Sequence, residues 1–337
     1  GIITVIFPAG LFILHVYSIV VRNHHSSMLP RILTASSETT LGSKSMWVHF
    51  QSKCRLLICP MQSDSVFILR LSAIVLTLCF SLGLTDIARA APFSSIVIDA
   101  STGRTLHQYR ANQQRYPASL AKMMTLYIMF EEIESGRLKP DTKIRISRQA
   151  ARQPASKLGL RSRSTITAQL AMQALIVKSA NDVATAVAEH IAGSEAKFAR
   201  RMTGKARQLG LYDTRFTNAS GLYHWRQQTT ARDMARLANL LLNRFPHFET
   251  VWRLREFDHK DKTYVSHNRL LSRLYGAMGM KTGYIRASGY NLATAVQRDG
   301  KRVIVVVLGS DSPQTRDRRV TALAERSLSR AIPMAEA

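Results

Sequence analysis

The sequence predicts an α+β fold, in which strands from both ends of the main domain form one antiparallel sheet packed with helices beside a helical lobe. Two observations carry this prediction. The segment "SSIVIDASTGRTLHQYR", residues 94–110, has the pattern of two strands around a turn at Ala100-Ser101-Thr102-Gly103. Near the other end, "YNLATAVQ" and "RVIVVVLGS" flank Asp299-Gly300, a strong hairpin signal. Helical patterns fill the interval, and this order is typical of α+β folds.

The first helix is predicted in "RYPASLAKMMTLYIMF", residues 115–130. Pro117 stands where a proline can begin a helix, and Ser119 follows within the first turn. Met123 and Tyr127 belong to an apolar face with helical spacing, and Gly136 ends the helix. Ser119 and Lys122 therefore lie at the mouth of a helix that enters the core.

The middle of the chain is predicted to be helical. Residues 165–192 have the pattern of two buried helices separated at residues 178–181. Further helices are expected at about 196–209 and 231–243, and a last one at about 314–329. The helical lobe is expected to form from these segments.

The N-terminal part has the features of an export signal. An apolar run at residues 66–84 leads to Ala88-Arg89-Ala90, so we expect residues 61–90 to be a signal peptide cleaved after Ala90. An uncleaved anchor helix is the alternative. Residues 1–60 are interpreted as an over-extended reading frame, and a membrane span in their apolar run at residues 2–21 is the alternative. Residues 91–337 then form the single functional domain.

Charge and cysteine content narrow the protein class. The 47 Lys and Arg residues outnumber 22 Asp and Glu residues, which favours anionic partners or simply a basic surface. No zinc-finger or RNA-binding motif accompanies the charge, so no nucleic-acid partner is expected. All three cysteines precede residue 80, and a cysteine-free body suits an exported protein.

Ser119 and Lys122 form a Ser-x-x-Lys motif. Residues three apart share one helix face, so the lysine amine can reach the hydroxyl and act as its base if its pKa is depressed. A helix-start hydroxyl beside a solvated lysine is the structural alternative. Ser194 and Lys197 repeat the pattern, so the motif alone is weak.

Ser179-Ala180-Asn181 occupies the break between the two buried helices. Polar side chains there are costly unless they are hydrogen-bonded or face a cleft. A second hydroxyl could relay a proton, whereas the structural alternative is a helix cap. Ser266-His267-Asn268 repeats this pattern as well.

Lys281-Thr282-Gly283 occurs once, just before the hairpin, and is expected on an adjoining strand, although a turn is the alternative. The three motifs follow one another 60 and 102 residues apart. In this order they form the joint signature of penicillin-binding proteins and class A β-lactamases.

Four longer stretches extend the likeness: "YPASLAKMMT", "PASKLGL", "VKSANDVATAVAEHIAG" and "MGMKTGYIRASGYNLATAV". With them the chain resembles the low-molecular-mass D-alanyl-D-alanine carboxypeptidases, serine peptidase family S11, over about residues 94–329. The resemblance implies a β-lactamase/transpeptidase-like fold. It also implies hydrolysis of the terminal D-Ala–D-Ala bond of peptidoglycan stem peptides, without metal or organic cofactor.

The resemblance also implies a role for each motif residue. Ser119 would form the acyl-enzyme, Lys122 would accept its proton, and Ser179 and Asn181 would relay protons and position groups. The implied substrate-binding residues are Lys281, Thr282, Gly283, Tyr284 and Arg316. The backbone N–H groups of Ser119 and Tyr284 would form the oxyanion hole, and Arg316 would bind the terminal carboxylate. Tyr284 stands where some relatives have histidine.

By the same resemblance, β-lactams should acylate the serine, and the enzyme should act in the periplasm. The chain ends soon after its last predicted helix, which favours a soluble enzyme whose membrane contact is limited to an uncleaved leader. A D,D-endopeptidase of the same family is the main alternative. A class A β-lactamase would need a Glu about 36 residues after the second motif, where Arg215 stands. A non-catalytic binder of cell wall is the remaining alternative.

Overall fold

The computed structural model describes residues 93–334. The expected signal peptide at 61–90, the segment 1–60 and the three cysteines lie outside these residues. Within the described part of the chain, no helix is both long enough and apolar enough to cross a bilayer.

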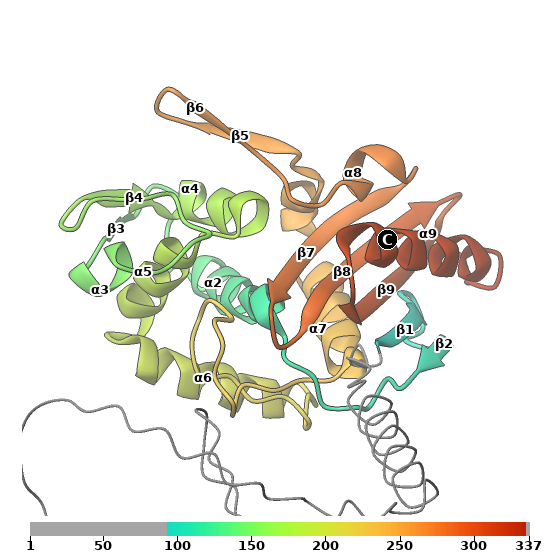
Figure 1. Ribbon diagram of the computed structural model, residues 1–337. Coiled ribbons are helices and arrows are strands. Elements are labelled where there is room, and N and C mark those ends of the chain that lie inside the picture. The colour runs from blue at the N-terminus through green and yellow to red at the C-terminus, as the bar shows by residue number, and fades with distance from the viewer. Residues whose placement is uncertain (1–92, 335–337) are drawn as a thin grey trace, which may run out of the picture. The chain divides into compact units, whose positions relative to one another are not determined.

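Strands from both ends of the described chain form one five-stranded antiparallel sheet in the order β2-β1-β9-β8-β7 (Figure 1). Its strands are β1 (Ser94–Asp99), β2 (Thr105–Tyr109), β7 (Ala277–Ile285), β8 (Gly289–Arg298) and β9 (Lys301–Ser310). The predicted hairpin turn joins β8 to β9, with Asp299 and Gly300 both at positive φ. The predicted α+β fold is therefore confirmed.

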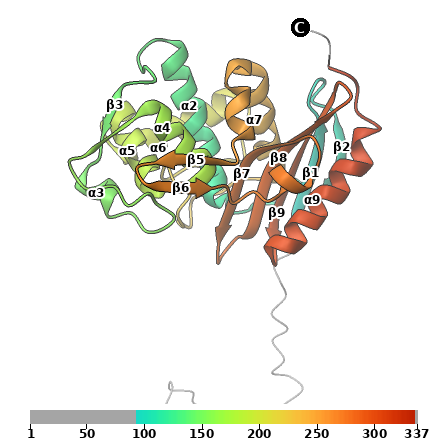
Figure 2. The ribbon, with the colours of Figure 1, turned by 90° about the horizontal axis from the view of Figure 1, so that it is seen from above.

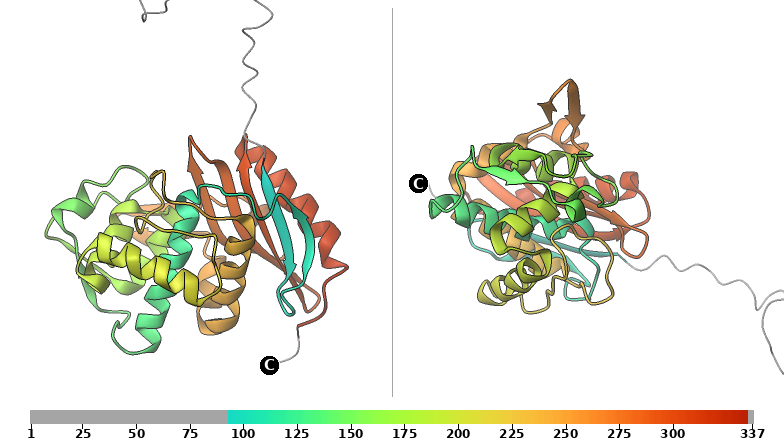
Figure 3. Two further views of the ribbon diagram at one scale, coloured as in Figure 1. Left: turned by 90° about the horizontal axis from the view of Figure 1, so that it is seen from below. Right: turned by 90° about the vertical axis from the view of Figure 1, so that its left-hand side faces the viewer.

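The sheet is covered on both faces, which explains the unbroken apolar run in β9. Val303, Val305 and Val307 pack against α9 (Pro313–Leu328), while Ile304 and Val306 belong to the larger core cluster with α7 (Ala231–Arg244). Successive residues of a strand point to opposite faces, so a strand buried on both sides must be apolar at every position. Figure 3 shows α9 and α7 on opposite faces of the sheet.

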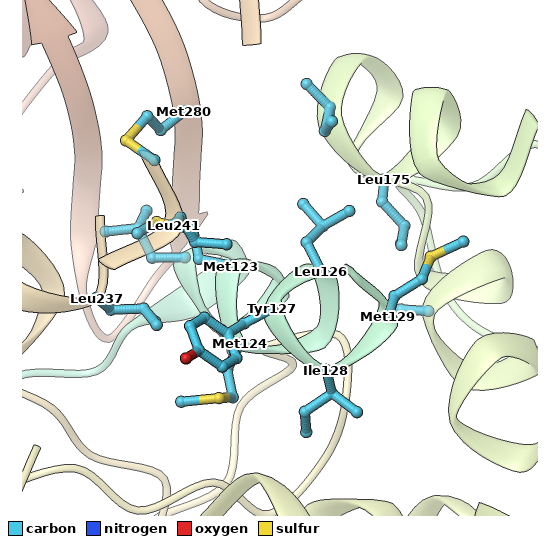
Figure 4. Close-up of a cluster of buried hydrophobic side chains, with 14 of the residues drawn as sticks. Met123, Met124, Leu126, Tyr127, Ile128, Met129, Leu175, Leu237, Leu241 and Met280 are labelled. Atoms are coloured by element: carbon cyan, nitrogen blue, oxygen red, sulfur yellow. The ribbon is translucent and has the colours of Figure 1, made fainter. Parts of the chain in front are cut away.

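Helix α2 (Lys122–Glu134) is the central helix of the larger core cluster (Figure 4). The sequence predicted an apolar face, but every residue from Lys122 to Phe130 is buried. The difference arises because α2 packs against α5 (Asn181–Ala192), α6 (Glu195–Gln208) and α7, and also contacts β7 of the sheet. A helix surrounded by other elements has no face left for solvent.

The helical lobe begins with β3 (Lys143–Arg145) and α3 (Arg148–Ala151) and continues through α5 (Asn181–Ala192) and α6 (Glu195–Gln208). The first of the two helices predicted over 165–192 is broken up. It consists of β4 (Thr165–Thr167), α4 (Ala168–Gln173) and a π-helical turn, η2 (Ala174–Lys178). Ser179 ends this turn in the left-handed region, at φ 59°.

The connection back to the sheet contains elements that the sequence did not predict. These are η3 (Pro246–Arg253), the hairpin β5 (Glu256–His259) with β6 (Lys262–Val265), and the short α8 (Leu270–Arg273). The hairpin packs against η2, and Figure 2 shows it extending toward the helical lobe. It therefore brings residues near 265–269 to the side of the second motif.

Candidate active site

Ser119 lies in a 3₁₀ turn, η1 (Ala118–Ala121), directly before α2. It does not cap the helix, because neither η1 nor α2 has a side-chain cap. Ala118 before it adopts φ 49°, a strained conformation for a residue with a Cβ. Asn291 of β8 donates to the carbonyls of Tyr116 and Pro117 at 3.1 and 3.2 Å, so the sheet holds this segment in place.

Lys122 is fully buried, and its amine joins the first two motifs. Its Nζ donates to Ser119 Oγ at 3.1 Å, to Asn181 Oδ1 at 2.8 Å and to the Ser220 carbonyl at 2.6 Å. Burial and the nearby Lys281 charge hold the pKa of Lys122 well below its usual value. A lysine in this setting can be neutral and accept a proton from the serine.

Ser179 and Asn181 stand on either side of Ala180, which is the N-cap of α5. Neither Ser179 nor Asn181 therefore caps α5, and the alternative that they form a helix cap is wrong. Asn181 Nδ2 donates to the Pro154 carbonyl at 2.9 Å, which fixes its amide so that Oδ1 faces Lys122. Ser179 is 5% exposed and lines the cleft described below.

The third motif lies on β7, at the edge of the sheet. Lys281 is buried, and its Nζ donates to the Thr282 carbonyl at 2.9 Å. Burial and the charge of Arg316 lower the pKa of Lys281 to about 7. A Cβ added to Gly283 would lie 3.1 Å from the Ser119 nitrogen, so this glycine allows β7 to approach the serine closely.

Arg316 occupies the first turn of α9 and is 4% exposed. Its Nε and Nη2 donate to Asp317 Oδ1 at 2.9 and 2.7 Å. Two of its five N–H groups are used in this pair. Arg316 lines the same cleft as Ser119 and Thr282.

One cleft of about 870 Å³ brings most of the predicted site residues together. Of the predicted residues it is lined by Ser119, Ser179, Asn181, Thr282, Gly283, Tyr284 and Arg316. Lys122 and Lys281 do not line the cleft but contact or flank residues that do. Tyr284 is 53% exposed and stacks on Tyr290, with ring centroids 4.3 Å apart.

The two repeats of the motifs serve ordinary local roles. Ser194 is the N-cap of α6, and its Oγ accepts a hydrogen bond from the Lys197 N–H at 3.3 Å. Asn268 Oδ1 accepts from the Leu270 N–H at 3.1 Å at the start of α8. These are the helix-start contacts that the Ser119 and Ser179 motifs do not make.

Sequence reasoning missed the second-motif neighbour Asp182. This buried carboxylate accepts the N–H groups of Leu158, Gly159 and Leu160 at 3.1, 2.9 and 3.2 Å. It thereby fixes the "PASKLGL" loop against the start of α5. The only available signal was an acidic residue directly after Asn181, which is also common in ordinary helix starts.

The segment around Gly221 was also missed, although the Ser220 carbonyl contacts Lys122. Gly221 has φ +86°, and a Cβ there would lie 1.8 Å from the Ala118 carbonyl oxygen. Its N–H donates to Asn218 Oδ1 at 2.7 Å. Gly221 therefore packs directly against Ala118, the strained residue before Ser119, and helps to fix the position of the serine.

Gly221→Ala is expected to lower the free energy of unfolding by about 3 kcal/mol, because it adds left-handed strain to a steric overlap. Chemical denaturation of the domain measures the change. Gly204→Ala is the matched control, since Gly204 lies within α6 and its added Cβ meets open space. The free energy of unfolding of Gly204→Ala should be up to about 1 kcal/mol higher than that of the parent. Equal stability of Gly221→Ala and the parent would contradict the assignment.

A family model described as D-alanyl-D-alanine carboxypeptidase, peptidase S11, matches residues 86–312. The chain belongs to this peptidase family. The predicted family membership is thus confirmed, and the match spans all three motifs.

Individual members of the S11 family show the same likeness. The chain is 32% identical over 244 residues to the D-alanyl-D-alanine carboxypeptidase DacF of Bacillus subtilis, covering 70% of this chain and 62% of that protein. It is 29% identical to a D-alanyl-D-alanine endopeptidase of Haemophilus influenzae, with 65% and 72% covered. The chain spans about three fifths of the length of the first curated relatives it matches.

Among solved S11-like structures, penicillin-binding protein D2 of Listeria monocytogenes in its ampicillin-bound form matches with a TM-score of 0.64 and 26% identity. The match covers 70% of this chain and 96% of that one. This likeness confirms the predicted penicillin-binding-protein fold.

Proposed function

We propose that this protein is a serine-type D-Ala-D-Ala carboxypeptidase that removes the terminal D-alanine from peptidoglycan stem pentapeptides. The observation that carries the proposal is the position of the Lys122 amine. It is buried, has a strongly lowered pKa, and lies 3.1 Å from the Ser119 hydroxyl. This pairing of a nucleophile with a desolvated base is what acyl transfer by serine requires.

The proposed reaction begins when Ser119 Oγ attacks the carbonyl carbon of the penultimate D-alanine and its proton passes to Lys122. The N–H groups of Ser119 and Tyr284 stabilise the negative oxygen of the tetrahedral intermediate. Ser179 passes a proton to the leaving amine, and D-alanine departs. Water then attacks the acyl-enzyme ester, which releases the shortened peptide and restores Ser119. The close approach of Gly283 to the Ser119 nitrogen supports this oxyanion site.

The terminal carboxylate of the substrate is proposed to bind at Lys281, Thr282 and Arg316. Two cations near one cleft wall support this assignment, since the Arg316 charge acts on buried Lys281. Strand β7 is an edge strand, so an extended peptide can pair along it. β-Lactams, which resemble the same dipeptide, are proposed to acylate Ser119. We also propose that the enzyme acts in the periplasm after export by the leader.

Release of free D-alanine from a soluble pentapeptide tests this function. We expect stoichiometric D-alanine and tetrapeptide, with little cleavage of cross-linked muropeptides under the same conditions. The second candidate is a D,D-endopeptidase, which the Haemophilus relative favours. Efficient cleavage of the cross-linked dimer without D-alanine release would replace the first proposal by the second.

A further inference from the structure

The cleft is strongly cationic beyond the groups that the reaction uses. Lys157, Lys178 and Arg269 line it in addition to Arg316, and none of its lining residues is Asp or Glu. Among the described residues, no carboxylate lies within salt-bridge distance of these three cations. If the terminal carboxylate of the substrate binds at Lys281 and Arg316, the charges of Lys157, Lys178 and Arg269 are therefore still unpaired.

The loop that carries Lys157 and the turn that carries Lys178 are joined by two hydrogen bonds. Ser156 Oγ donates to the Lys178 carbonyl at 2.8 Å, and the Asn181 N–H donates to the Ser156 carbonyl at 2.7 Å. The loop that carries Lys157 is thus tied to the end of η2, which carries Lys178. Both side chains are only partly exposed, so their charges are less screened than those of fully solvated lysines.

Lys178 is further held by the β5–β6 hairpin, because its Nζ lies 5.9 Å from the centre of the Tyr264 ring. His267, which also lines the cleft, has an exposed side chain, yet its pKa is lowered by desolvation and by the Lys281, Lys178 and Arg316 charges. Near neutral pH this histidine therefore adds no positive charge but can donate a hydrogen bond. The lysines and the histidine together offer cations and a donor to an anion.

We propose that Lys157 and Lys178 form a second anion subsite, which binds a side-chain carboxylate of the acyl part of the peptide. The inference rests on the proposed carboxypeptidase function. The leaving D-alanine carries one carboxylate, so a second one must come from a residue on the other side of the scissile bond. The substrate class is then an acidic peptide ending in D-Ala-D-Ala, favoured over its neutral amidated counterpart.

The test compares two acetylated tripeptides, acetyl-X-D-Ala-D-Ala, in which X carries a side-chain carboxylate or the corresponding amide. At low salt we expect kcat/KM for D-alanine release to be about fivefold higher for the carboxylate, as partly exposed ion pairs allow. The combined substitution Lys157→Gln and Lys178→Gln should bring this ratio close to one. Added salt should reduce the ratio in the parent enzyme.

Lys262→Gln is the matched control. Its Nζ also lies over the Tyr264 ring, at 5.5 Å, but Lys262 does not line the cleft. This variant should keep the parent ratio. Penicillin labelling of each variant shows that it is folded.

Equal rates on the two tripeptides would overturn the subsite and leave the carboxypeptidase function standing. A preference that survives the double substitution, or that Lys262→Gln also removes, would overturn it too. Absence of D-alanine release from both tripeptides would overturn the proposed activity and this inference with it.

Discussion

Ser119→Ala should abolish covalent labelling by penicillin and lower D-alanine release by about 10⁶-fold, the loss typical when a catalytic serine is removed. Within the described residues, the Lys122 Nζ is hydrogen-bonded only to Ser119 Oγ, Asn181 Oδ1 and the Ser220 carbonyl. No second hydroxyl of these residues contacts this amine, so none can replace Ser119 as the nucleophile. Labelling of purified protein with a fluorescent penicillin, followed by denaturing electrophoresis, measures the adduct.

Ser194→Ala is the matched control for this experiment, because Ser194 and Lys197 repeat the motif away from the cleft. Ser194 caps α6, so its removal should cost about 1 kcal/mol of stability and leave labelling intact. Full labelling of Ser119→Ala, or loss of labelling in a folded Ser194→Ala, would contradict the assignment of the nucleophile.

The sequence was sufficient for the sheet and for most helices because their patterns are local. The Asp299-Gly300 turn and the apolar run of β9 indicate a hairpin without knowledge of the rest of the chain. The π-helical turn η2 and the left-handed Ser179 were not predictable in this way. Their conformation depends on contacts with the 154–160 loop and the β5–β6 hairpin, which lie far away in the sequence.

The site shows the same division between local and long-range information. The three motifs could be found because their residue types and order are distinctive together. Asn291 and Gly221, which hold the strained turn before Ser119, carry no such signal. Asn291 acts through side-chain hydrogen bonds to a segment distant in the sequence, and Gly221 acts through a close approach of two backbones. The motif residues around Ser119 can therefore be predicted from the sequence, but the residues that hold its backbone in place can be identified only from the structure.

Lys122→Met is expected to lower the rate of acylation by about 10³-fold, within the range for loss of a general base. Methionine is likewise unbranched but ends where Lys122 has its Cε, so the amine is removed and Ser119 loses its proposed proton acceptor. Asn181 Oδ1 and the Ser220 carbonyl each lose a donor, which should also reduce stability by about 2 kcal/mol. Stopped-flow measurement of penicillin acylation separates this rate from binding, and a near-parent rate would exclude Lys122 as the base.

The parent enzyme should show a bell-shaped dependence of kcat/KM on pH. Lys122 must be neutral to accept a proton, so activity falls as pH drops through its lowered pKa. Lys281 must be protonated to attract the terminal carboxylate, so activity falls again as pH rises above about 7. The two lysines interact, and each limb therefore reports a value that belongs to the pair.

Lys281→Gln tests this coupling directly, because the Lys281 charge is one cause of the low pKa of Lys122. Removing that charge should raise the pKa of Lys122 and move the acidic limb to higher pH. The alkaline limb near pH 7 should disappear, because no lysine remains there to lose its proton. A profile with both limbs unmoved would show that the two amines act independently, and the proposed division between base and carboxylate-binding cation would then be wrong. A shift of the acidic limb together with loss of the alkaline limb requires two different roles for the two amines. Lys122 is then the base, while the charged Lys281 attracts the substrate carboxylate and lowers the pKa of Lys122.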